Sequence, residues 1–187
     1  MRIEKLRKHY DIIVQWVSFP LHPDTPADGL SLNELFAGRN LDIVQMMQRL
    51  RKVALDLGLP FGERQKTYNS RLAQELSKWA EFQGKGDQFH EAMFRAYFVE
   101  GINIGKPEEL VRLAGSIGLS GDQAQSVLDA RSFEQAVDAD WKRSHALGIT
   151  AVPTFVVNNA KLVGAQSYEA LEQFLIGEGG QKRNETR

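Results

Sequence analysis

The chain has no cysteine among its 187 residues. Because a thiolate is the nucleophile of thiol–disulfide exchange, the chain by itself can perform no dithiol chemistry. Its net charge of −1 gives no general attraction to nucleic acid or to an anionic membrane. No apolar run is long enough to span a membrane, and the first residues are charged, unlike a signal peptide. We therefore expect a cytoplasmic protein with no nucleic-acid or membrane partner.

Motifs for nucleotide, hydrolase and metal chemistry are also missing. There is no Walker A loop, no GxGxxG and no GxSxG. The four histidines are not at ligand spacing with carboxylates, and Asp138 and Asp140 are two residues apart on an expected helix, where they do not face one another. We expect no metal site and no bound cofactor.

The most informative stretch is residues 148–165, GITAVPTFVVNNAKLVGA. It predicts a strand from Thr154, a turn at Asn158-Asn159-Ala160 and a second short strand. The first strand is entered through Val152–Pro153, the one type of peptide bond that tolerates the cis form. A cis bond would leave the backbone of Val152 free to pair with an extended peptide. The alternative is a trans proline that starts an edge strand.

The rest of the chain has a simple pattern. Residues 11–19, DIIVQWVSF, predict a buried strand, and the proline-rich residues 20–29 predict a loop. From the capping box at Ser31 onward the pattern is helical for about a hundred residues. One of these helices has apolar residues every three or four positions, which predicts a buried face: Leu41, Val44, Met47, Leu50, Ala54 and Leu57.

Four segments, in this order, resemble DsbA-family thioredoxin-like proteins: FPLHPDTP (19–26), YNSRLAQELSKWA (68–80), FRAYFVEGINIGKPEEL (94–110) and GITAVPTFVVNNAKLVGAQSYEALEQFL (148–175). The closer resemblance is to the FrnE-like branch, which is related to 2-hydroxychromene-2-carboxylate isomerases. It implies an α/β thioredoxin-like fold with a large all-helical insertion. The thioredoxin-like unit would be discontinuous, at 1–29 and 131–179, with the insertion at 30–130 and a disordered tail at 180–187.

The resemblance also implies the site residues. The Val-Pro-Thr tripeptide would be the family's cis-proline loop, which faces the active site and binds substrate: Val152, Pro153 and Thr154. In the related isomerases an asparagine near the active site falls in the segment of Asn69; the alternative for Asn69 is a plain helix N-cap. His22 is the notable polar residue of the 20–29 loop, and its alternative is a solvated histidine. No catalytic residue is assigned.

The resemblance does not extend to the family's opening strand and Cys-x-x-Cys, or to the serine that replaces it in the isomerases. Residues 1–11 look like the end of the first helix. In thioredoxin folds the opening strand lies between the strands expected here at 11–19 and from Thr154. Three hypotheses follow: the protein starts upstream, two chains pair edge to edge, or the sheet closes with 11–19 directly beside the Thr154 strand.

The expected function is that of a DsbA-like thioredoxin-fold oxidoreductase whose present chain has no redox activity. One alternative is a glutathione-dependent isomerase, and another is a non-catalytic module that binds a peptide or glutathione. The expected partners are a peptide, a thiol or a small molecule, with glutathione as a substrate, and a homodimer follows from the edge-pairing hypothesis.

Overall fold

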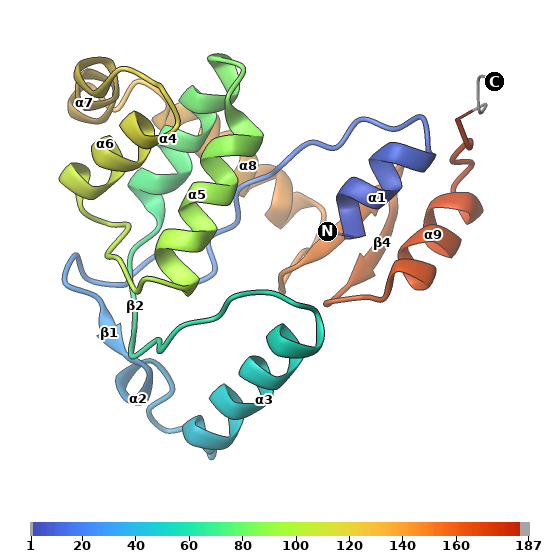
Figure 1. Cartoon of the computed structure of the whole chain (residues 1–187), viewed down its shortest axis with the longest axis horizontal. Helices are drawn as coiled ribbons and strands as arrows, with labels where there is room; N and C mark the ends of the chain where they lie inside the picture. The colour runs from blue at the N-terminus through green and yellow to red at the C-terminus, as the bar shows by residue number, and fades with distance from the viewer. Residues whose placement is uncertain (1, 184–187) are drawn as a thin grey trace. The chain divides into compact units, whose positions relative to one another are not determined.

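The computed structural model describes residues 2–183, which form parts of two compact units. Unit 1 joins the N-terminal residues up to Leu21 to the residues from Asp140 onward, and unit 2 is His22–Ala139. Figure 1 colours the chain from blue to red along this path. The sequence placed the ends of the helical insertion at 30 and 130, whereas the compact units divide at 21/22 and within a helix at 139/140.

Unit 2 is mainly helical. It contains β1 (Leu30–Ser31), α2 (Leu32–Leu35), α3 (Ile43–Asp56), β2 (Lys66–Thr67), α4 (Arg71–Phe82), α5 (Gly86–Phe98), α6 (Pro107–Ser116), α7 (Gly121–Asp129) and the start of α8 (Glu134–Ala146). The two short strands form an antiparallel pair. The capping box at Ser31 is confirmed, because the Ser31 hydroxyl accepts from the Glu34 amide and the Glu34 carboxylate accepts from the Ser31 amide.

The core of unit 2 lies among α4, α5, α6 and α7. Leu76, Phe89 and Leu110 are fully buried there, as the helical spacing of their segments predicts. The aromatic residues of α5 do not all enter this core: Phe94 is exposed and stacks on Phe98 at a centroid distance of 5.6 Å.

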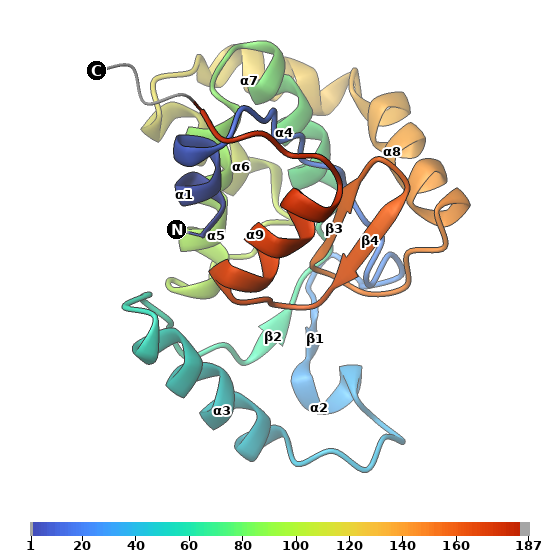
Figure 2. The same cartoon turned by 90° about the vertical axis from the view of Figure 1, so that its right-hand side faces the viewer.

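The predicted buried face of the 41–57 helix is largely wrong. Only Met47 and Ala54 are buried on α3, and the other predicted core positions are exposed: Leu41, Val44, Leu50 and Leu57. Helical spacing shows that a helix has an apolar face, but not that another element covers it. The α4–α7 core forms without α3, which lies at the margin of unit 2 in both views (Figures 1 and 2).

Unit 1 contains α1 (Arg2–His9), the end of α8, β3 (Thr154–Val157), β4 (Ala160–Val163) and α9 (Tyr168–Gly177). The predicted hairpin is confirmed: β3 and β4 pair antiparallel, and Asn158 has the positive φ of 54° that its turn requires. Apolar side chains of the hairpin pack on a small core shared by α1 and α9, centred on Leu6, Tyr10, Leu171 and Leu175. Figure 2 shows α9 beside the hairpin.

The predicted buried strand at 11–19 is wrong. No residue from Asp11 to Phe19 is in a strand, and Ile13 is 98% exposed. A strand requires a neighbour for its backbone groups, and within residues 2–183 the sheet of unit 1 holds only β3 and β4. The segment is fixed near its end instead, where the Ser18 amide donates to Asp140 at 2.8 Å. The hypothesis that the sheet closes with 11–19 beside the Thr154 strand is therefore also wrong.

Within residues 180–183 the structure differs from the predicted disordered tail. Lys182 forms a β-bridge with Tyr10, and the Arg183 amide donates to the His9 carbonyl at 2.8 Å. The Arg183 guanidinium also donates to the Tyr10 carbonyl at 3.0 Å. Residues 184–187 lie outside the described residues.

Candidate functional site

The Val152–Thr154 loop enters β3 through a cis peptide bond between Val152 and Pro153. Two hydrogen bonds fix the loop. The Pro153 carbonyl accepts from the Gly164 amide at 2.8 Å, and the Thr154 hydroxyl donates to the Ala151 carbonyl at 2.6 Å. Val152 and Pro153 are nevertheless exposed, Val152 by 44%. The loop is thus held in shape while its surface is accessible.

One edge of β3 is open within residues 2–183. In an antiparallel pair, alternate residues direct their backbone groups toward the partner strand. Pro153 directs its carbonyl toward β4, so the next residue, Thr154, directs its backbone groups to the opposite edge. No described strand pairs with that edge, and no hydrogen bond within the described part of the chain uses the backbone of Val152. A backbone of this kind can accept an added strand.

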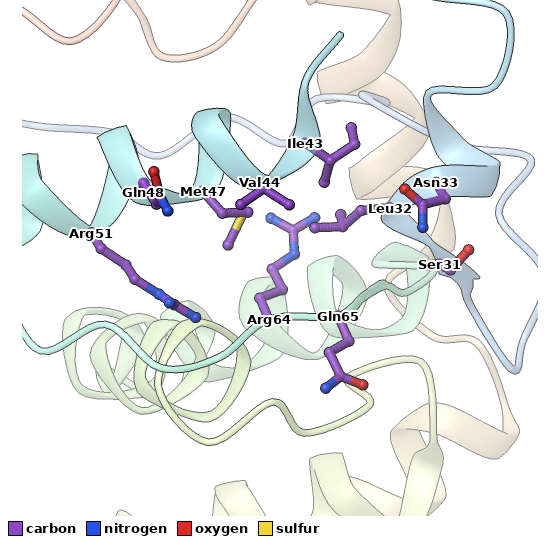
Figure 3. A pocket seen from close by; sticks show the side chains of 10 residues that line it. All are labelled: Ser31, Leu32, Asn33, Ile43, Val44, Met47, Gln48, Arg51, Arg64 and Gln65. Atoms are coloured by element: carbon purple, nitrogen blue, oxygen red, sulfur yellow. The ribbon is translucent and has the colours of Figure 1, made fainter.

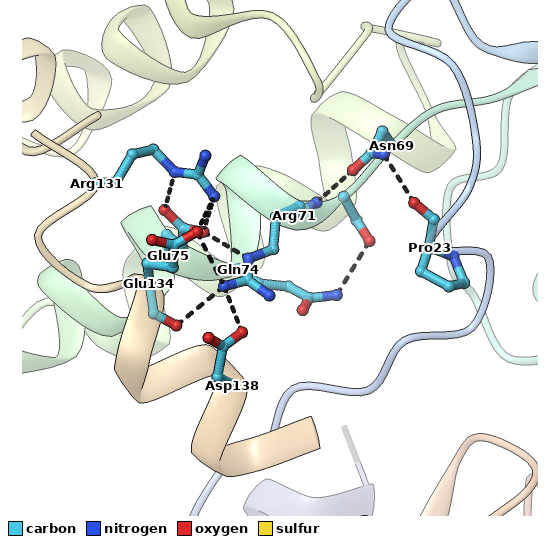
Figure 4. A network of polar contacts seen from close by, with 9 residues as sticks. Pro23, Asn69, Arg71, Gln74, Glu75, Arg131, Glu134 and Asp138 are labelled. Atoms are coloured by element: carbon cyan, nitrogen blue, oxygen red, sulfur yellow. Dashed lines mark hydrogen bonds and ion pairs between the residues drawn. The ribbon is translucent and has the colours of Figure 1, made fainter. Parts of the chain in front are cut away.

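Asn69 links the start of α4 to the loop that contains His22 (Figure 4). Its side-chain amide donates to the Pro23 carbonyl at 3.1 Å and to the Thr25 carbonyl at 2.8 Å. Its side-chain oxygen accepts from the Arg71 amide at 2.9 Å, which satisfies one free donor of the helix. Both hydrogens of the amide are therefore used within the protein, and the residue positions a loop.

We expect Asn69→Ala to lower the free energy of unfolding by about 1–3 kcal/mol, because it leaves partly buried backbone groups without partners. Chemical denaturation of the variant measures this. Asn40→Ala is the matched control: Asn40 is exposed and makes no side-chain hydrogen bond in the described structure, so its replacement should be nearly neutral. Equal, small effects in the two variants would contradict the positioning role.

His22 is half-buried at the start of the same loop. Its carbonyl accepts from both the hydroxyl and the amide of Thr25. Burial lowers the pKa of the His22 imidazole, and the nearby guanidiniums of Arg64 and Arg39 lower it further. This lowering favours the neutral form of the ring. The structure joins the His22 loop to Asn69 in unit 2, whereas Val152, Pro153 and Thr154 belong to unit 1.

A buried ion-pair network on α4 was not predicted from the sequence. Glu75 is only 1% exposed and lies between two arginines. It accepts from Arg71 at 2.5 Å and from Arg131 at 2.6 and 2.7 Å, and Arg71 also pairs with Asp138 at 2.7 Å (Figure 4). The four-residue spacing of Arg71 and Glu75 was a readable signal, but nothing local indicated Arg131.

The charge of Glu75 is maintained by these arginines. Burial alone would raise the pKa of the Glu75 carboxyl, but hydrogen bonds from Arg131 and Arg71 outweigh burial and hold the pKa below its usual value. Arg131 follows α7 with a φ of 50°, in the left-handed region usually occupied by glycine. Glu75 is thus paired with an arginine whose backbone lies in a region that favours glycine.

A hollow of about 450 Å³ lies beside α3 (Figure 3). Met47 and Val44 of α3 line it together with Leu32, and Arg51 and Arg64 supply positive charge. Arg64 is held by the Lys66 carbonyl at 3.1 Å and lies over the ring of Tyr97 at 4.8 Å. None of the predicted site residues lines this hollow.

The described residues hold no group of three or more His, Cys, Asp or Glu side chains that could bind a metal ion. Among the same residues, no helix combines the length and the apolar character needed to cross a membrane.

A family model described as a DSBA-like thioredoxin domain matches residues 1–176. This chain belongs to that family. The match establishes the thioredoxin-like fold, an α/β fold with a helical insertion. It covers nearly all of the chain, so the resemblance of the four segments is confirmed at the level of the family.

Several known proteins are similar to this DsbA-like chain. YwbO of Bacillus subtilis strain 168, an uncharacterized protein, is 27% identical over 96% of this chain and 88% of its own length. The crystal structure of SCO1869 from Streptomyces coelicolor, a probable DsbA oxidoreductase, is 27% identical with a TM-score of 0.85, covering 95% of this chain and 81% of that one.

Two more distant structures share the fold. A 2-hydroxychromene-2-carboxylate isomerase is 18% identical with a TM-score of 0.72, covering 95% of this chain and 85% of that one. The cytosolic disulfide reductase DsbM from Pseudomonas aeruginosa, solved with GSH, is 24% identical with a TM-score of 0.54, covering 74% of this chain and 77% of that one.

Proposed function

We propose that this DsbA-like chain binds a short extended thiol peptide, such as glutathione, by backbone pairing at Val152 and the open edge of β3. The observation that carries the proposal is that Val152 is an exposed residue whose backbone makes no hydrogen bond within the described residues. A substrate in extended conformation would receive one bond from the Val152 amide and donate one to its carbonyl. Because the structure of DsbM was solved with GSH, glutathione is the first ligand to test.

The binding step is separate from redox chemistry. Thiol–disulfide exchange requires a thiolate that attacks a disulfide sulfur, and these 187 residues contain none. We propose that the chain acts as the substrate-binding part of an oxidoreductase lineage, in the FrnE-like branch, and that any attacking thiolate comes from outside these residues. A cytoplasmic location is part of the proposal, supported by the cytosolic DsbM.

Titration of the ¹⁵N-labelled chain with reduced glutathione tests the binding. The Val152 amide should shift and saturate, because it gains a hydrogen bond, whereas the Gly164 amide already donates to Pro153 and should change little. Val152→Pro removes the donor and should weaken binding about tenfold, while Val152→Ala keeps it and should bind normally. Saturable shifts that spare Val152, or equal affinities of the two variants, would contradict the proposal.

The second candidate is a glutathione-dependent isomerase. The fold of the isomerase covers 95% of this chain, and Asn69, the residue that this resemblance indicates, is fixed beside the His22 loop. Both amide hydrogens of Asn69 are already donated to backbone carbonyls, so none is left for a substrate, which favours the first candidate. A spectrophotometric assay of 2-hydroxychromene-2-carboxylate with glutathione decides between them, since only the isomerase would give turnover.

An edge-to-edge homodimer is a further hypothesis, which the open edge of β3 within residues 2–183 supports. Sedimentation velocity of the Leu50→Lys variant distinguishes it from a dimer formed through α3.

A further inference from the structure

Helix α3 has a row of apolar side chains at coiled-coil spacing. Met46, Leu50, Val53 and Leu57, called the α3 seam below, follow one another at intervals of four, three and four residues. This is the a and d pattern that pairs two helices. Leu50, Val53 and Leu57 are 44%, 54% and 44% exposed. α3 attaches to unit 2 through a neighbouring face, because its buried residues are Met47 and Ala54. The seam is therefore available to a partner.

Two opposite charges flank the seam on one side. Arg49 and Asp56 are seven residues apart and both occupy the position immediately before a seam residue. Arg49 makes one described contact, with Gln45 of its own helix at 2.6 Å. Asp56 lies in the last turn of α3, where the negative end of the helix dipole disfavours an acid, and the described residues supply it no cation. A cation of a partner beside Asp56 would offset this unfavourable interaction between the carboxylate and the helix dipole.

We propose that α3 pairs antiparallel with α3 of a second copy of this chain. A two-fold axis near the middle of the helix places Leu50 beside the partner's Val53, and Met46 beside the partner's Leu57. The same register places Arg49 beside the partner's Asp56, and the symmetry repeats this ion pair. The flanking charges thus match the helix to its own copy.

The charges also select this arrangement over others. A shift by one heptad in either direction would place Arg49 against the partner's Arg49, or Asp56 against the partner's Asp56. A parallel pair would place Arg49 beside the partner's Ala54, with no charge to meet. Only the central antiparallel register joins opposite charges at both ends. A seam of four residues buries less surface than the roughly 800 Å² per partner that is typical of stable complexes. The dimer should therefore be reversible and dependent on concentration.

Sedimentation velocity over a wide range of protein concentration tests the proposal. The unmodified chain should dimerise as its concentration rises. Leu50→Lys should weaken the dimer at least about tenfold, because it places a cation in the apolar seam. Leu55→Lys is the matched control: Leu55 is on the same helix and 78% exposed, but it points away from the seam, so dimerisation should be unchanged. Circular dichroism verifies that both variants are folded.

A charge exchange tests the register. Arg49→Asp and Asp56→Arg should each weaken the dimer, since each creates two like-charge contacts, and the double variant should restore it. A chain that stays monomeric at every concentration would overturn the proposal. A dimer that persists in Leu50→Lys would also overturn it and would favour pairing at the β3 edge. Failure of the double variant to recover would reject the register, and with it the argument from charge.

Discussion

Glu75→Ala should lower the free energy of unfolding by about 3–5 kcal/mol, because removing one member of a buried ion pair leaves charge without compensation. Arg71 and Arg131 both donate to this carboxylate, and they would be left facing each other in a poorly solvated site. Arg131 is partly exposed and Arg71 retains Asp138, so the lower end of the range is the better expectation. Urea denaturation followed by circular dichroism gives the value.

Glu81→Ala is the matched control on the same helix. Glu81 is exposed and pairs with Lys78 at 3.4 Å, so its loss should cost less than about 1 kcal/mol. Arg131→Ala should fall between the two, since Glu75 would keep Arg71. If Glu75→Ala cost no more than Glu81→Ala, the network would not be a source of stability.

The same network predicts the response to acid. The folded-state pKa of Glu75 lies below its value in the unfolded chain, so the unfolded state binds a proton more readily. The stabilisation is fully present above the unfolded pKa of about 4.5 and is lost as the pH falls through the lower, folded pKa. Glu75→Gln should therefore show a smaller decrease of unfolding free energy between neutral pH and pH 3 or so than the unmodified chain. Parallel curves for the two proteins would exclude Glu75 as a contributor.

The second large effect is an absence of catalysis. In an assay of disulfide reduction by dithiothreitol, adding this chain should leave the rate at that of the blank, although its relatives include a probable DsbA oxidoreductase. The reason is chemical: exchange proceeds through a mixed disulfide, which needs a cysteine sulfur on the enzyme, and the chain has none.

An active thioredoxin-fold reductase is the positive control, and boiled protein controls for trace thiols. A rate above the blank that follows the folded chain through gel filtration would contradict the prediction. If the chain binds glutathione at Val152 and does not raise the rate of disulfide reduction, a binding role is supported. If it neither binds glutathione nor raises the rate, glutathione is not its ligand.

The sequence predicted well those features that neighbouring residues decide. The hairpin around Asn158–Asn159 follows from turn chemistry, and the capping box at Ser31 uses two side chains three residues apart. The buried faces of α4 and α6 follow from helical spacing, and these two faces pack in the same core. The four segments with family resemblance predicted the fold of the family to which the chain belongs.

The sequence failed where the outcome depended on residues far away. The β-branched residues of 11–19 have strand propensity, but within residues 2–183 no strand lies beside them to receive their hydrogen bonds. The apolar face of α3 is visible in the sequence, whereas its lack of cover is a property of the packed unit.

By itself, then, the sequence determined the family, the hairpin and the absence of a cysteine thiol from these residues. Those depend on local conformation and on which atoms are present. The tertiary structure alone decided that Arg131 reaches Glu75 across 56 positions of the chain and that Asn69 is committed to two loop carbonyls. It also decided that the Val152 backbone stays unpaired within the described residues. Hydrogen bonds between distant segments depend on how the chain packs, and no local pattern of residues specifies them.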